Sequence, residues 1–128
     1  MEKEFVPYTE ALELKKLGFN EPCFGFYDDI DDDHPVSFIR IESLCDKLKS
    51  SITLAPLYRQ AFRWFRETYE LHSFIDCKWK NLGWEFQLVD LSKMETISSI
   101  DRYNYKTDKE AELECLKKLI EIVKEKQL

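Results

Sequence analysis

The sequence predicts an α+β protein in which antiparallel β-hairpins alternate with amphipathic helices. Two pairs of short apolar runs each consist of neighbours in the chain, a pattern that favours antiparallel pairing. Helical periodicity precedes, separates and follows these pairs, so the predicted order is αββ(α)αββα, in which the bracketed helix is short. The expected architecture is therefore an antiparallel sheet built from two β-hairpins, with helices packed on it.

Composition supports a single folded domain over residues 1–128. Hydrophobic residues make up 44% of the chain, and three Gly and four Pro leave little room for linkers. The longest apolar run is only a few residues, too short for a transmembrane helix. The first residues lack the basic and apolar regions of a secretory signal, so we expect a cytoplasmic protein.

The first helix has clear signals at both ends. Thr9 is the predicted N-cap, and apolar residues recur with helical spacing at Ala11, Leu14 and Leu17. Gly18 follows as the residue that adopts a left-handed conformation beyond the helix, and Phe19 supplies the apolar residue after it.

Residues 23–27 and 36–41 are predicted to form the first hairpin, and a short helix is expected over residues 43–49. Between the two strands lies an acidic run whose default interpretation is a solvated hairpin tip. Two alternatives stay open for it, a site for a hard cation or an imitation of DNA phosphates. An EF-hand is disfavoured, because the sixth position counted from Asp29 is His34 instead of Gly. The acidic residues of the run are Asp28, Asp29, Asp31, Asp32 and Asp33.

Residues 56–69 are predicted to form the most informative helix, with Pro56 at its first position. At about 100° per residue, three arginines fall together beside the apolar stripe, and we call them the arginine edge. Trp64 lies on the opposite flank, where we expect a partly exposed aromatic edge. The arginine edge consists of Arg59, Arg63 and Arg66, and the apolar stripe of Tyr58, Ala61, Phe62, Phe65 and Tyr69.

The second hairpin is predicted from period-2 alternation over residues 71–80 and 84–88, around a turn at residues 81–83 that ends in Gly83. Residues 92–106 are polar and weakly patterned. The last helix begins at the capping box formed by Thr107 and Glu110. Its apolar arc is wider than one packing surface needs, so we consider a homodimer through this helix.

Catalytic and metal-binding motifs are absent from the sequence. The four cysteines, Cys23, Cys45, Cys77 and Cys115, form no CxxC pair, and we expect buried, inert thiols. Three glycines are too few for a phosphate-cradling loop. We therefore predict a protein that is not an enzyme and needs no cofactor or metal. An enzyme would have to assemble acid/base groups from distant residues such as His72, Asp76 and Glu85.

Three blocks of the sequence carry a resemblance: FVPYTEALELKKLGFNEPCF (residues 5–24), APLYRQAFRWFRETYEL (residues 55–71) and EAELECLKKLIEIVKEK (residues 110–126). Together they resemble a group of small phage and prophage proteins of Bacteroidetes-type bacteria. The helix–hairpin–helix order of the second half is loosely similar to the phage helix–sheet–helix (ABA) sandwich domains. The resemblance implies a bacterial host cell as the setting. It implies no activity, and no site residue is carried over from it.

The predicted function is binding of a host macromolecule, and the expected partner is a protein. Its anchors would be Arg59, Arg63, Trp64 and Arg66, because Trp and Arg are enriched at interface hot spots. An alternative is a nucleotide- or phosphate-binding module, in which the same arginines clamp phosphates in a pocket beside residues 92–105. A third interpretation is that the arginines simply pair with nearby carboxylates such as Glu67 and Glu70. The net charge of −6 disfavours general nucleic-acid binding.

Overall fold

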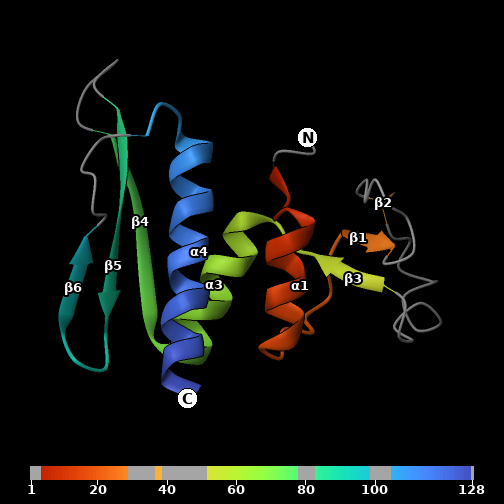
Figure 1. Cartoon of the computed structure of the whole chain (residues 1–128), viewed down its shortest axis with the longest axis horizontal. Helices are drawn as coiled ribbons and strands as arrows, with labels where there is room; N and C mark the ends of the chain where they lie inside the picture. Colours follow the sequence, from red (N-terminus) through yellow and green to blue (C-terminus); the bar gives the residue numbers. More distant parts are fainter. Residues whose placement is uncertain (1–3, 29–36, 39–51, 78–82, 99–104, 128) are drawn as a thin grey trace. The chain divides into compact units, whose positions relative to one another are not determined.

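A computed structural model of the chain describes residues 4–28, 37–38, 52–77, 83–98 and 105–127 (Figure 1). It confirms an α+β fold built on antiparallel hairpins. The chain divides into two compact units, Met1–Tyr58 and Arg59–Leu128, and each is described by itself. The single domain over residues 1–128 stays a prediction. The elements are α1 (Tyr8–Lys16), β1 (Gly25–Asp28), β2 (Ser37–Phe38), β3 (Ile52–Ala55), α3 (Tyr58–Tyr69), β4 (Leu71–Cys77), β5 (Trp84–Asp90), β6 (Glu95–Ser98) and α4 (Asp108–Gln127).

The first unit contains a three-stranded antiparallel sheet in the order β2-β1-β3, with α1 packed against β3. The pairing of β1 with β2 confirms the first predicted hairpin. Strand β3 was not predicted, and its burial pattern explains why. The smaller side chains Thr53 and Ala55 are buried, whereas the larger Ile52 and Leu54 are half-exposed. This pattern reverses the one from which a half-buried strand is recognised.

Helix α1 ends as predicted and begins differently. Its N-cap residue is Pro7, without a side-chain cap, so the assignment of Thr9 as the N-cap was wrong. At the other end Gly18 has φ +102° and its N–H donates to the Lys15 carbonyl at 3.1 Å. The Phe19 N–H donates to the Leu14 carbonyl at 2.9 Å, which completes a Schellman motif.

Gly18→Ala should destabilise the first unit by about 1 kcal/mol, because alanine is strained at this positive φ. A Cβ added at Gly18 meets no atom within 4 Å, so the whole cost comes from the backbone conformation. Gly18→Asn is the control, since Asn tolerates the left-handed region better and should lose less. Thermal unfolding of the full chain followed by far-UV circular dichroism measures the effect. An alanine variant as stable as the asparagine variant would contradict it.

The second unit contains the antiparallel sheet β4-β5-β6, and α4 packs against β4 and β5 (Figure 1). Cys77 lies opposite Trp84 in the register, which confirms the second predicted hairpin. The two hairpins therefore contribute to two sheets of three strands each instead of one. Strand β6 was missed, because the exposed polar residues of its segment carry no period-2 apolar signal.

Helix α4 begins as the capping box predicts. The Glu110 N–H donates to the Thr107 hydroxyl at 3.1 Å, as the capping box requires, whereas the Glu110 carboxylate accepts from the Lys106 N–H at 3.1 Å instead of from the Thr107 N–H. The apolar arc of the helix is buried within a single chain, so its width alone does not require a second copy. The homodimer stays a prediction. The buried residues of α4 are Ala111, Cys115, Leu116, Leu119, Ile120, Ile122 and Val123.

Three further expectations need correction. Helix α3 begins at Tyr58, and Pro56 lies before it, where its carbonyl accepts from the Val6 N–H at 2.9 Å. Trp64 is only 8% exposed, so the partly exposed aromatic edge was wrong. Cys23 and Cys115 are buried as expected, but Cys77 is exposed at the end of β4. The short helix at 43–49, the acidic residues 29–33, the turn residues 81–82 and Cys45 lie outside the described residues.

Candidate functional site

The arginine edge forms because α3 buries one face and leaves the neighbouring one in solvent. Ala61 and Phe65 are fully buried, whereas Arg59, Arg63 and Arg66 are exposed. The helix ends at Glu70, which has φ +58° and whose N–H donates to the Arg66 carbonyl at 3.1 Å.

All three arginines line one hollow in the second unit, and we call it the arginine hollow. Its volume is about 460 Å³, within the range of small-molecule sites. Helix α3 supplies one wall, β4 supplies a second and α4 contributes an acidic side chain. The lining residues are Arg59, Phe62, Arg63, Arg66, His72, Ser73, Ile75 and Glu112.

The electrostatics of the arginine hollow differ in sign from those of the whole chain. Among the described lining residues, three guanidinium groups and the Glu112 carboxylate leave two positive charges in excess. The rise of an α-helix places Arg59 and Arg66 about 10 Å apart along the axis. A row of guanidinium groups of that length suits a ligand with more than one anionic group, because each guanidinium presents a fork of donors to a phosphate or carboxylate.

Pairing with neighbouring carboxylates does not account for the whole arginine edge. Within the part of the chain that the structure describes, no ion pair joins the side chains of Arg59 or Arg66 to Glu67 or Glu70. Arg63 has a partner of its own. Two of the three guanidinium groups are therefore exposed beside the hollow without a carboxylate partner among the described residues.

The structure separates Trp64 from the other three predicted anchors. Its ring makes edge-on contacts with Phe65 at 5.0 Å and with Tyr69 at 5.4 Å between centroids. These contacts and its burial make Trp64 part of the core. An aromatic ring does line the hollow, but it belongs to Phe62, which the sequence assigned to the core stripe.

The position of the hollow also differs from the predicted one. A pocket was expected beside residues 92–105, of which 99–104 lie outside the described residues, whereas the described residues that line the hollow all come from α3, β4 or α4. The contributions of His72, Ser73 and Glu112 were missed. The sequence could have predicted the contribution of His72 and Ser73, because β4 follows α3 after a single residue and so must fold back near it.

The structure does not bring together the three residues that were considered as an acid/base group, His72, Asp76 and Glu85. Asp76 and Glu85 lie directly opposite each other in the register of β4 and β5. His72 is four residues from Asp76 on the same strand, about 13 Å away between Cα atoms at the rise of a β-strand. That separation exceeds the reach of a hydrogen bond or of one bridging water.

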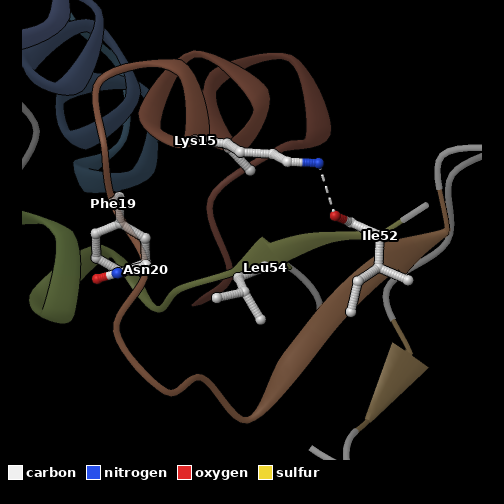
Figure 2. Close-up of a pocket in the computed structure, with 6 residues that line it drawn as sticks. Lys15, Phe19, Asn20, Ile52 and Leu54 are labelled. Atoms are coloured by element: carbon white, nitrogen blue, oxygen red, sulfur yellow. Dashed lines mark hydrogen bonds between the residues drawn. The ribbon is translucent and has the colours of Figure 1, made fainter. Parts of the chain in front are cut away.

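A second, smaller hollow lies in the first unit, between α1 and β3 (Figure 2). Its volume is about 150 Å³, and Lys15 lies across it, where its Nζ donates to the Ile52 carbonyl at 2.9 Å. The ammonium group is thus engaged by the protein's own backbone. This hollow is below the usual size of a small-molecule site.

Outside the arginine hollow, the described residues Asp90 and Cys115 have shifted pKa values. The pKa of Asp90 is lowered from 3.8 to about 2, chiefly because the Ser92 hydroxyl donates to its Oδ1 at 2.6 Å, with a further contribution from Lys126 at 3.2 Å. Burial raises the pKa of the Cys115 thiol far above its usual range, so this thiol stays protonated.

Among the described residues, no group of three or more His, Cys, Asp or Glu side chains could hold a metal ion. No described helix is both long enough and apolar enough to span a bilayer. Comparison with known proteins adds no relative: no family model, no curated protein and no solved structure matches the chain.

Proposed function

We propose that this protein is a non-enzymatic binding protein whose arginine hollow takes a small phosphate-bearing ligand. The observation that carries the proposal is the convergence of Arg59, Arg63 and Arg66 on one hollow that His72 and Ser73 also line. Guanidinium groups bind phosphate bidentately, because each presents a fork of N–H donors.

The charge of the chain favours a small ligand over a nucleic acid. The net charge is −6, so a long polyanion is repelled by the protein as a whole, whereas a small anion interacts mainly with the locally positive hollow. We place this binding in the cytoplasm of a bacterial host cell, in a phage or prophage setting. The free thiols Cys23, Cys77 and Cys115 support a reducing compartment.

Binding of a host protein is the second candidate, and an exposed aromatic residue next to the hollow favours it. Phe74 is 47% exposed on β4, and its ring packs edge-on against His72 at 4.4 Å between centroids. An exposed aromatic residue in contact with His72, which lines the arginine hollow, is of a kind enriched at interface hot spots. In this candidate an acidic segment of the partner would occupy the arginine edge, and Phe74 would replace Trp64 as the aromatic anchor.

The test of the proposed function is a thermal-shift screen with inorganic pyrophosphate, nucleotides, cyclic dinucleotides and magnesium. A ligand at a hundred times its dissociation constant adds about 2.7 kcal/mol to the stability, a shift of several degrees for a domain of this size. We expect a shift with phosphate-bearing ligands that is lost in the triple variant Arg59→Ala, Arg63→Ala, Arg66→Ala.

The matched control removes the same charge elsewhere in the second unit, by the triple variant Lys117→Ala, Lys118→Ala, Lys124→Ala in α4. None of these lysines lines the arginine hollow. The control should keep the full shift, and equal shifts in both triple variants would contradict the proposal. If no phosphate-bearing ligand shifts the wild-type protein, the host-protein candidate takes its place.

A further inference from the structure

The acidic residue in the arginine hollow is the starting point for a narrower inference. Glu112 lies in the second turn of α4, and its side chain is 17% exposed. Its Oε1 is 3.4 Å from the Lys109 Nζ, so a neighbour on the same helix helps to hold the carboxylate in place. A carboxylate beside bound phosphate weakens the binding of a bare polyphosphate, because like charges repel. The same carboxylate strengthens the binding of a ligand that also carries hydrogen-bond donors.

A flat apolar surface lies next to the arginines. Phe62 lines the hollow and lies three residues after Arg59, on the apolar stripe that borders the arginine edge of α3. Aromatic rings of this kind stack on nucleobases, with a contribution of about 1–3 kcal/mol per base. The hollow thus offers three kinds of contact: cations for phosphate, a ring for stacking and a carboxylate for donors.

We infer that the arginine hollow takes a nucleoside diphosphate whose base carries an amino group, with guanine as the best fit. The phosphates lie on Arg59, Arg63 and Arg66, the base stacks on Phe62, and its donors face Glu112. Guanine presents a ring N–H and an amino group side by side, which two carboxylate oxygens accept together. Uracil has no amino group and makes the weaker contact. This inference rests on the proposed function and adds the class of base.

The central test is the effect of Glu112→Gln on two ligands, measured by calorimetric titration of the full chain. A glutamine side chain has one acceptor and one donor, so it cannot accept two hydrogen bonds from guanine. We expect guanosine diphosphate to bind about tenfold to a hundredfold more weakly to this variant, as for the loss of hydrogen bonds to a charged group. Inorganic pyrophosphate should bind more tightly to it, because the repulsion is removed. Opposite signs for the two ligands are the expected result.

Two further variants separate the inference from general damage to the fold. Glu114→Gln removes the same charge from α4 at a residue that does not line the hollow, and it should change neither affinity. Phe62→Leu keeps an apolar side chain but removes the ring. It should weaken guanosine diphosphate severalfold and leave pyrophosphate unchanged.

The outcomes that overturn the inference differ from those that overturn the proposed function. If Glu112→Gln changes both affinities in the same direction, or if guanosine and uridine diphosphates bind the wild type equally, the base assignment is wrong while the phosphate site stands. If the triple arginine variant binds pyrophosphate and guanosine diphosphate as the wild type does, the phosphate site is wrong as well. Failure of the wild type to bind any nucleoside diphosphate overturns the inference, and failure to bind pyrophosphate or any other phosphate-bearing ligand as well overturns the proposed function.

Discussion

Leu116→Ala should lower the free energy of unfolding by about 2–5 kcal/mol, the range for removing a fully buried leucine side chain. Leu116 is 0% exposed on α4, the helix that packs against β4 and β5. Deletion of three carbon atoms there forfeits apolar burial and leaves a cavity that a helix packed on two strands cannot close. Because a domain of this size is stable by only about 5–15 kcal/mol, the variant should lose a large part of its stability.

The experiment is urea denaturation followed by tryptophan fluorescence. All three tryptophans, Trp64, Trp79 and Trp84, belong to the second unit, so the signal reports the unit that contains Leu116. Leu113→Ala is the matched control, since it is the same substitution on the same helix at a half-exposed position. We expect it to cost clearly less. Equal losses for the two variants would show that α4 does not bury the face described above.

Asp90→Asn should remove a contribution to stability of about 1–2 kcal/mol at neutral pH, because it replaces a charged acceptor of several hydrogen bonds. Asp90 is 4% exposed at the end of β5. The Ser92 hydroxyl and the Ser92 N–H donate to its Oδ1 at 2.6 and 3.1 Å, and Lys126 of α4 donates to its Oδ2 at 3.2 Å. The carboxylate therefore joins the turn after β5 to the last turn of α4.

The lowered pKa of Asp90 predicts in which direction its contribution to stability changes with pH. The pKa of Asp90 is lowered from 3.8 to about 2 in the folded protein, so folding favours the ionised form. The stabilisation is fully present well above pH 3.8 and is lost as the pH falls from about 4 towards 2. The difference in the free energy of unfolding between wild type and Asp90→Asn should shrink over that interval in urea titrations.

Glu95→Gln, which changes an exposed carboxylate at the start of β6, is the control and should differ less from the wild type in the free energy of unfolding. A difference that stays constant with pH for Asp90→Asn would contradict the assignment.

The sequence was most informative where a structural feature depends on one or two residues. Gly18 and Phe19 predicted the end of α1, and Thr107 with Glu110 predicted the start of α4, because these residues satisfy orphan backbone groups locally. Strand β3 escaped prediction for the opposite reason. Its pairing with β1 is a long-range contact, and the residues that it buries are the small Thr53 and Ala55.

The arginine edge was predicted from helical geometry alone, but the hollow beside it was not. A helical wheel places Arg59, Arg63 and Arg66 on one stripe, yet it does not show what faces that stripe. The wall that His72 and Ser73 contribute depends on how β4 folds back, which is a tertiary property. The same limit explains the error at Trp64, whose flank of the helix becomes buried only in the folded chain.

The two sheets differ in how far apart along the chain their paired residues lie, and this difference sets how long each first strand waits for its partner during synthesis. In the second unit Cys77 faces Trp84, seven positions away, whereas in the first unit Asp28 faces Ile52, 52 − 28 = 24 positions away. Closing the longer loop costs about 1 kcal/mol more in chain entropy, and contacts between distant residues slow folding. A ribosome must also translate and release β3 before β1 has its partner on that side. The first strand of the amino-terminal sheet thus waits for 24 further residues to be made before β3 can pair with it, whereas β4 waits for only seven before β5 can pair with it.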